Sequence, residues 1–303
     1  MQKRILITGS NGLLGQKLIS ALKSKYHLLA TSTGHCILSQ KSGFEYQTLD
    51  ITRAQEVVQV FDNFKPHVVV NAAAMTDVDG CETNRNLCHK VNVDAVSVLA
   101  QACKKHQTHF IQISTDFIFD GENGPYVESD IPNPLCYYGL SKLKSEQILQ
   151  KSDCKWAILR TIILYGTAEN LKRNNIVLWA RKALKEGQPL HIIDDQFRSP
   201  TLAEDLAQAC LLVIEKEATG IYHTSGKDIM SIYEMINRMA DFYKCPKTFI
   251  NRISSKTLNQ KAIRPPKTGF IIEKSMRELN YQPHTFEEGL QILEQQLNQQ
   301  TNL

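Results

Sequence analysis

Apolar residues follow two different spacings along the first half of the chain. Five short runs rich in β-branched and apolar residues are typical of buried parallel strands, and they cover residues 4–8, 27–30, 68–72, 110–114 and 157–161. Between these runs, apolar residues recur three and four positions apart, as in amphipathic helices. The helical stripes are Leu13, Leu14, Leu18, Ile19 and Leu22; Val57, Val58, Phe61 and Phe64; and Val91, Val93, Val96, Leu99, Ala100 and Cys103. This alternation predicts an α/β fold with an open, doubly wound parallel sheet that helices cover on both faces.

The pattern changes after Gly166. A helix is predicted at about 175–186, then a short apolar piece at 190–193 and the loop DDQFRSPT. A helix at 203–215 and a strand at 220–223 look like elements that return to the sheet. One strong helix follows residue 229, and a final helix lies near 286–299. We therefore predict a nucleotide-binding domain at 1–166, to which 199–226 return, and a smaller, interleaved substrate lobe formed by 167–198 and 227–303.

Composition excludes several classes of protein. The 303 residues are 42% apolar and 22% charged, with a formal charge of +4 from scattered basic residues, which argues against disorder and against a nucleic-acid partner. No apolar run approaches the roughly 20 residues that span a bilayer, and the basic start is followed by too short an apolar run for a signal peptide. None of the eight cysteines has C-x-x-C spacing, so no metal site is predicted. We expect a cytoplasmic protein with free thiols and no membrane partner.

Three glycines separate the first predicted strand from the first helix. The sequence ILITGSNGLLG places them at Gly9, Gly12 and Gly15, a G-x-x-G-x-x-G spacing rather than the usual G-x-G-x-x-G. A sharp turn, close approach of a pyrophosphate to backbone N–H groups, and tight helix packing all favour residues without a Cβ atom. The loop therefore predicts a dinucleotide site, and a simple tight turn is the alternative.

Residues at the ends of the next strands refine the predicted cofactor. The second strand ends in Ser32 and Thr33, where an acidic residue would favour NAD, so NADPH is preferred and NADH is the alternative. Asp50 either contacts the adenine edge or caps the helix that begins near residue 53. The small residues 72–74 after the fourth strand leave room for a cofactor, although they also suit tight packing.

A hydroxyl, a phenol and an amine stand in order near the middle of the chain. Thr115 ends the fifth predicted strand, and Tyr138 and Lys142 follow with Y-x-x-x-K spacing on a predicted helix. One helical turn separates the last two, so both project the same way, whereas Tyr137 points about 100° away. An ammonium beside a phenol would lower the phenol's pKa, and such a tyrosine can donate a proton to a carbonyl oxygen that Thr115 polarises. An accidental helix-surface pair is the alternative.

These segments together resemble the extended short-chain dehydrogenase/reductases, and most closely the dTDP-4-dehydrorhamnose reductase family. The matching segments, from residue 5 to about 226, are TGSNGLLG, NAAAMTDVDGCE, VN, STDFIFDG, YVESDIPNPLCYYGLSK, ILRTIILYG, DDQFRSPT and GIYHTSG. The resemblance implies a Rossmann-type fold and NAD(P)H-dependent reduction of the 4-keto group of a nucleotide-linked 6-deoxyhexose, giving dTDP-L-rhamnose. It assigns Thr115, Tyr138 and Lys142 as the catalytic set, and Lys142 also to the nicotinamide ribose.

Candidate contacts follow from the loop, the strand ends and the resemblance. The predicted cofactor contacts are Gly9, Ser10, Asn11, Gly12, Leu13, Leu14, Gly15, Ser32, Thr33, Asp50, Ile51, Ala72, Ala73, Ala74, Asn92, Tyr138 and Lys142. The predicted substrate contacts are Thr76, Asp116, Asn175 and Arg198. The expected partner is a nucleotide-sugar substrate, and a homodimer is left open.

Three positions depart from the family pattern at the substrate end. Ile163 stands where many of these reductases have tryptophan, Met75 where they have tyrosine, and Arg198 where they have glycine. Arg198 could offer a bidentate fork to a diphosphate, or it could pair with Asp194 or Asp195 as a structural clasp; we favour the first.

Two rival functions share this pattern. The chain also resembles the regulatory β subunit of methionine adenosyltransferase, which implies a dinucleotide-binding partner without important turnover. A sugar-nucleotide epimerase or dehydratase has the same fold, but dehydratases commonly have an acidic pair after the strand-end threonine, and Asp116 is followed here by Phe117. The intact set of Thr115, Tyr138 and Lys142 favours a reductase.

Overall fold

A seven-stranded parallel sheet forms the centre of the computed structural model, which describes residues 2–171 and 174–301. Its strands are β1 (Arg4–Thr8), β2 (His27–Ser32), β3 (Glu45–Thr48), β4 (Val68–Asn71), β5 (His109–Thr115), β6 (Trp156–Thr161) and β11 (Gly220–His223). Their order is β11-β6-β5-β4-β1-β2-β3, and every neighbouring pair is parallel. The predicted doubly wound fold is confirmed, including the return of 220–223 to the sheet edge.

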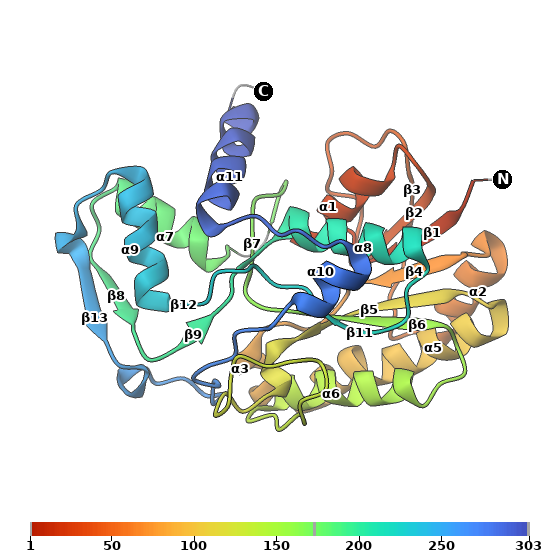
Figure 1. Ribbon diagram of the computed structural model, residues 1–303. Coiled ribbons are helices and arrows are strands. Elements are labelled where there is room, and N and C mark those ends of the chain that lie inside the picture. Colours follow the sequence, from red (N-terminus) through yellow and green to blue (C-terminus); the bar gives the residue numbers. More distant parts are fainter. Residues whose placement is uncertain (1, 172–173, 302–303) are drawn as a thin grey trace.

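Helices cover both faces of this sheet, as Figure 1 shows. On one face lie α1 (Leu13–Leu22), α8 (Ala203–Lys216) and α10 (Glu273–Leu279); on the other lie α2 (Ala54–Phe64), α5 (Ala95–His106) and α6 (Tyr137–Gln150). Each face has its own apolar core against the sheet. In α2 the prediction needs one correction: Val57, Val60 and Phe61 are buried, whereas Val58 is 43% exposed, because the buried stripe of a helix recurs at three and four residues.

A second layer of elements forms the lobe at the left of Figure 1. It contains α7 (Ile176–Lys185), β8 (Leu190–Ile193), α9 (Ile232–Tyr243), β13 (Ile250–Ile253) and α11 (Phe286–Thr301), which share a third apolar core. Strand β13 pairs with β8 in parallel, and β9 (Phe197–Arg198) pairs with β12 (Met230–Ser231). Between the sheet and this lobe, β7 (Leu164–Tyr165) pairs with β10 (Thr201–Leu202).

The predicted boundary of the substrate lobe is wrong at α10. Although we assigned all of 227–303 to the lobe, α10 packs against α8 and β11. Leu279 and Tyr281 belong to the core of the sheet. The chain therefore returns to the sheet a second time before α11.

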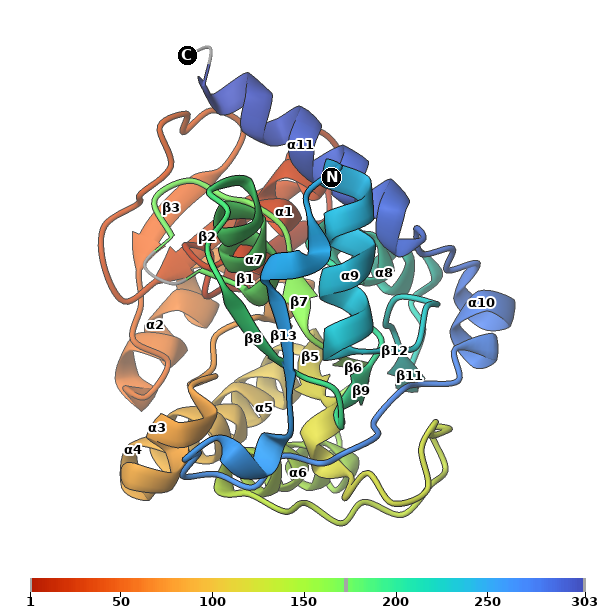
Figure 2. The ribbon, with the colours of Figure 1, turned by 90° about the vertical axis from the view of Figure 1, so that its left-hand side faces the viewer.

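Two further helices connect β4 to α5. These are α3 (Val78–Thr83) and α4 (Arg85–His89), and a π-helical turn at Lys90–Asp94 joins α4 to α5. Both helices lie near the first turn of α6 (Figure 2). Among the helices of the described ranges, none is long and apolar enough to cross a membrane.

Candidate active site

The glycine loop has little room for side chains at two of its three glycines. Gly9 has a φ of +67°, and a Cβ atom there would lie 2.7 Å from the backbone nitrogen of Ala73. A Cβ at Gly15 would lie 2.3 Å from the carbonyl oxygen of Gly9. Gly12 is the N-cap of α1. The first and third glycines are therefore required by close packing of the loop onto the segment that follows β4 and of the helix onto the loop.

The same loop has the features that an anionic dinucleotide needs. No side chain caps the N-terminus of α1, so its first-turn N–H groups are available to a phosphate. The Ser10 hydroxyl oxygen is buried and has no hydrogen-bond partner among the described residues. Thr33, just past the end of β2, is exposed. These residues fit a nicotinamide dinucleotide, with its pyrophosphate at the α1 N-terminus.

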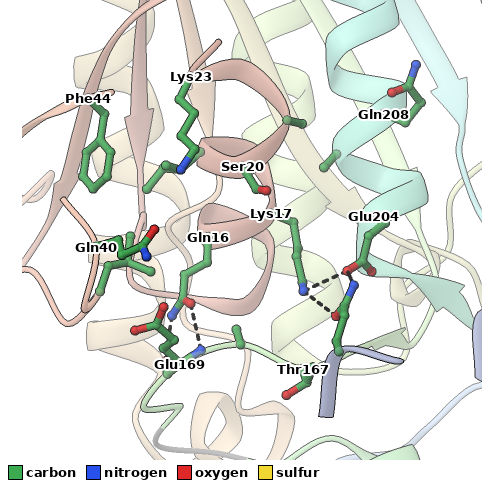
Figure 3. A pocket seen from close by; sticks show the side chains of 16 residues that line it. Gln16, Lys17, Ser20, Lys23, Gln40, Phe44, Thr167, Glu169, Glu204 and Gln208 are labelled. Atoms are coloured by element: carbon green, nitrogen blue, oxygen red, sulfur yellow. Dashed lines mark hydrogen bonds and ion pairs between the residues drawn. The ribbon is translucent and has the colours of Figure 1, made fainter. Parts of the chain in front are cut away.

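Asn11 has a supporting role that the sequence did not indicate. Its Nδ2 donates to the carbonyl oxygen of His35 at 2.9 Å, so its side chain holds the loop after β2. The backbone of Glu169 contacts the side chain of Gln16 through two hydrogen bonds of 2.8 and 2.9 Å (Figure 3). The Glu169 carboxylate also accepts from the backbone N–H of Ser39. Segments after β2 and β7 are thus held together beside the glycine loop.

A separate polar cavity of about 460 Å³ lies on the outer side of α1. In Figure 3, Lys17 points toward Glu204 of α8, with 2.8 Å between Nζ and Oε1. Lys23 and Phe44 line the opposite wall. None of the predicted catalytic residues lines this cavity, so it is distinct from the candidate site.

The predicted helix cap at Asp50 is wrong. Its Oδ1 accepts from the backbone N–H of Thr52 at 2.9 Å and from the Thr52 hydroxyl at 2.8 Å, which forms a local turn before α2. The N-cap of α2 is Arg53, and it makes no side-chain cap. Ile51 is 5% exposed and belongs to the core, so a cofactor contact there is limited to the backbone or a small part of the side chain.

The Asn92 side chain is buried beneath the segment after β4 and does not face the predicted cofactor site. It is 1% exposed, and its Oδ1 accepts from the backbone N–H of Met75 at 2.8 Å, while Nδ2 donates to the Met75 carbonyl oxygen at 3.0 Å. Nδ2 also contacts the Ser141 hydroxyl on α6. The predicted cofactor contact of the Asn92 side chain is not supported. Asn92 instead fixes the segment that continues from Ala72, Ala73 and Ala74, which are all half-buried.

Thr115 and Tyr138 come together at the carboxyl end of β5. The Tyr138 ring packs edge-on against Phe117 with 5.7 Å between ring centroids. Burial raises the pKa of the Tyr138 phenol, and the nearby Thr115 hydroxyl opposes that rise only in part. Tyr138 is therefore protonated at neutral pH.

Lys142 does not lower the pKa of Tyr138 as predicted. Its side chain is buried, and Nζ donates to the carbonyl oxygen of Ile113 on β5 at 2.6 Å. Burial lowers the pKa of Lys142 itself to about 8, while the negative charge of Glu146 opposes that shift. The predicted effect on Tyr138 fails because burial of the phenol outweighs any effect of the amine.

Tyr137 packs against the α3–α4 segment, as its helical position predicts. Its hydroxyl lies 3.3 Å from Nδ1 of His89, the Arg85 guanidinium lies 5.2 Å from its ring centroid, and its backbone N–H donates to Glu82. These contacts account for Tyr137 as a packing residue.

Two predicted substrate contacts lie at different depths. Thr76 is exposed after β4 and can face a ligand. Asn175 is the N-cap of α7: its Oδ1 accepts from the backbone N–H of Leu178 at 3.1 Å, and Nδ2 donates to the Gly166 carbonyl oxygen at 2.8 Å. Both ends of the Asn175 amide are thus engaged within the protein.

Arg198 and Asp116 are both turned inward, which contradicts the predicted diphosphate contact. Arg198 is 2% exposed, and its Nε lies 3.6 Å from Oδ2 of Asp116, which is also 2% exposed. The alternative clasp with Asp194 or Asp195 is also wrong: Asp194 pairs with Arg252, and Asp195 accepts from a serine pair at 254–255. The remaining Arg198 donors contact protein oxygens, so the guanidinium has no free fork for a substrate.

A buried ion pair between α6 and β6 was missed by the sequence analysis. Glu146 is 0% exposed one turn after Lys142, and it forms a bidentate contact with Arg160 of β6, at 2.8 Å for the Nη2–Oε2 contact. Ser114 donates to the same carboxylate. The only signal in the sequence was an arginine within an apolar strand, because its partner is distant in the chain.

The arrangement supports proton transfer to a carbonyl oxygen beside a dinucleotide. The phenol, the threonine hydroxyl and the lysine lie at the carboxyl ends of the strands, where ligands of open α/β sheets bind. The glycine loop lies at the end of β1, where the strand order reverses between β1 and β4.

Comparison with known proteins gives the family. The model of the RmlD substrate binding domain matches residues 3–299. The chain is 32% identical over 301 residues to the dTDP-4-dehydrorhamnose reductase of Aggregatibacter actinomycetemcomitans, covering 95% of this chain and 97% of that protein. It is also 32% identical over 260 residues to the methionine adenosyltransferase 2 subunit beta of Xenopus tropicalis, covering 84% of this chain and 76% of that protein.

A solved structure extends the likeness to three dimensions. The dTDP-4-dehydrorhamnose reductase of Bacillus anthracis, in complex with NADP, has a TM-score of 0.85 at 29% identity, and the match covers 97% of this chain and 99% of that one. The resemblance stated from the sequence is thereby confirmed. Because the family model extends over nearly the whole described fold, this chain belongs to the RmlD substrate binding domain family.

Proposed function

We propose that this protein reduces the 4-keto group of a nucleotide-linked deoxysugar, converting dTDP-4-dehydro-L-rhamnose to dTDP-L-rhamnose with NADPH. The chain is an NAD(P)H-dependent oxidoreductase of its family. The observation that carries the proposal is the pairing of Thr115, at the carboxyl end of β5, with Tyr138, in the first turn of α6, at the same edge of the sheet as the glycine loop, with Lys142 one turn further along α6.

The residues of the chain have separate roles in this reaction. NADPH held at the glycine loop would supply a hydride for the carbonyl carbon. Tyr138, which burial keeps protonated, donates its proton to the carbonyl oxygen. The Thr115 hydroxyl, which donates to Asp116 in this structure, turns its proton to the same oxygen when the carbonyl binds. Lys142 holds α6 against β5 through the Ile113 carbonyl and thereby keeps Tyr138 at the end of that strand.

The cofactor site follows the strand ends. Gly9, Gly12 and Gly15 would hold the pyrophosphate together with the N-terminus of α1. Ser32 and Thr33 lie at the end of β2 without a carboxylate at these positions, which supports NADPH over NADH. A cytoplasmic location and a homodimer stay predictions.

The test is cofactor consumption with a panel of substrates. Purified protein is mixed with NADPH and several 4-keto nucleotide sugars, and the absorbance of the reduced nicotinamide is followed. We expect the fastest loss of absorbance with dTDP-4-dehydro-L-rhamnose. No loss with any substrate, together with tight NADPH binding, would overturn the proposed reduction.

The second candidate is a regulatory subunit that binds a dinucleotide. The observation that favours it is the match to methionine adenosyltransferase 2 subunit beta over 84% of this chain. Such a protein has no need of a protonated tyrosine beside a threonine at the ligand edge. Co-purification with a methionine adenosyltransferase catalytic subunit, without cofactor turnover, would support this second function.

A further inference from the structure

A buried ion pair lies directly behind the proposed catalytic threonine. Asp116 follows Thr115 at the end of β5, and Arg198 comes from β9, more than 80 positions later in the chain. The side chains are each 3% exposed, and 3.6 Å separates Nε from Oδ2. A desolvated pair of this kind is tolerated only where the remaining polar atoms are also satisfied.

Those remaining atoms are satisfied, and they connect three segments. Asp116 Oδ1 accepts from the Thr115 hydroxyl at 3.1 Å, and Oδ2 accepts from the Thr268 hydroxyl. Arg198 donates to the carbonyl oxygens of Pro265 at 2.7 Å and Pro266 at 3.1 Å. The catalytic strand end is therefore tied to β9 and to the segment at 265–268.

The Thr115 hydroxyl is held on two sides by this arrangement. It donates to Asp116 and accepts from the backbone N–H of Phe117 at 3.3 Å, while it also meets the Tyr138 phenol. These partners, together with the stiffness of a β-branched side chain about χ1, favour one rotamer of Thr115. Loss of the Asp116 acceptor would free that rotamer and change the distance between the two hydroxyls.

We propose that Arg198 and Asp116 are positioning residues for the reduction: Arg198 holds the Asp116 carboxylate in place, and Asp116 orients the Thr115 hydroxyl against Tyr138. The proposal rests on the proposed function. Arg198 stands at a position where the family pattern has glycine, and here its guanidinium contacts Asp116 and backbone carbonyl oxygens.

The pair predicts a specific rescue. Arg198→Met leaves a buried carboxylate without its partner, which then takes up a proton or turns toward water, and both outcomes disturb Thr115. Asp116→Asn removes the charge and keeps an acceptor for Thr115. In the double variant no unpaired charge remains, so the double variant should work better than Arg198→Met alone.

The experiment compares the wild-type protein, Arg198→Met, Asp116→Asn and the double variant in NADPH-dependent reduction. We expect Arg198→Met to lower kcat by about tenfold or more with KM changed by less than about threefold, and the double variant to recover most of that loss. The matched control is Arg277→Met, which removes an exposed ion pair with Glu278 on α10, a helix that packs against the sheet and not in the lobe, and should leave kcat unchanged.

Three outcomes decide the proposal. A double variant no faster than Arg198→Met would overturn it, because Arg198 would then act only through the Pro265 and Pro266 carbonyls. NADPH affinity and thermal unfolding are measured for each variant as controls. If Arg198→Met does not fold, Arg198→Lys replaces it. Arg198→Lys keeps the positive charge and should retain most of kcat. If the wild-type protein itself turns over no substrate, the proposed function fails. The contact between Arg198 and Asp116 is then tested by the free energies of unfolding of the two single variants and the double variant. If the effects of the two substitutions simply add, the proposed pairing is overturned.

Discussion

The Lys142 ammonium donates to the carbonyl oxygen of Ile113 at 2.6 Å and so joins helix α6 to strand β5. Lys142 is 3% exposed, and a charged amine in such a place is unfavourable unless its hydrogen bonds compensate for lost hydration. The contact keeps α6 close to the strand that carries Thr115. It also makes the protonation state of Lys142 part of the stability of the fold.

The stability of the protein should therefore depend on pH through Lys142. Burial lowers its pKa from 10.5 to about 8, so the unfolded chain binds more protons than the folded one between these values. The free energy of unfolding then rises with pH across that window. Relative to Lys142→Met, the wild-type protein should gain about 2–3 kcal/mol between roughly pH 7 and pH 10, measured by urea unfolding. A difference that stays flat with pH would show that Lys142 titrates normally.

Tyr138 and Tyr137 should differ sharply when each loses its hydroxyl. Tyr138→Phe removes the proton donor and should lower kcat by about 10²–10⁴ while leaving NADPH affinity nearly unchanged. Tyr137→Phe loses only a contact with His89 and should be mild. Steady-state kinetics and cofactor titration measure both. A collapse at position 137 but not at 138 would reverse the assignment.

Gly139 allows α6 to approach the backbone of the residues that follow β5. A Cβ atom at this glycine would lie 2.0 Å from the carbonyl oxygen of Phe117, so Gly139→Ala must displace the first turn of the helix and Tyr138 with it. We expect a loss of about 1–3 kcal/mol or more in the free energy of unfolding, together with lower kcat.

The matched control for Gly139 is Gly34→Ala. No atom lies within 4 Å of a Cβ added at Gly34, so this change should alter stability by less than about 0.5 kcal/mol. Equal destabilisation at both glycines, seen in thermal or urea unfolding, would contradict the packing argument.

Asn92 should behave as a structural residue. Asn92→Ala leaves the N–H and carbonyl of Met75 without their partners inside the protein, which should cost on the order of 2 kcal/mol in the free energy of unfolding. The dissociation constant of NADPH should change by less than about threefold, because the side chain does not face the loop. The dissociation constant is measured by titration calorimetry. A large loss of NADPH affinity with unchanged stability would show that Asn92 contacts the cofactor, as the sequence analysis predicted.

The fold could be predicted, and the proposed catalytic residues could be picked out, because both depend on local spacing. Strand and helix periodicities identified the central sheet, since a buried parallel strand is a short apolar run wherever it lies. One helical turn separates Tyr138 from Lys142 in any helix, so the distinction from Tyr137 needed no tertiary information. The glycine loop was likewise visible as three residues at a strand–helix junction.

The misassigned residues are those whose partners are distant in the chain. Arg198 looked like a free fork, but Asp116 and the carbonyls near residue 265 meet it only in the folded protein. Asn92 looked like a ligand contact until its amide was seen to hold Met75. The pKa of Tyr138 depends on burial by many residues at once, which no motif encodes.

The sequence by itself determined the parallel sheet, the glycine loop and the proposed set of Thr115, Tyr138 and Lys142, because periodicity and spacing are properties of neighbouring residues. Only the tertiary structure decided which polar side chains face the ligand edge and which serve inside the protein. The physical reason is desolvation: a buried charge or amide must find a partner, and folding chooses that partner from the whole chain.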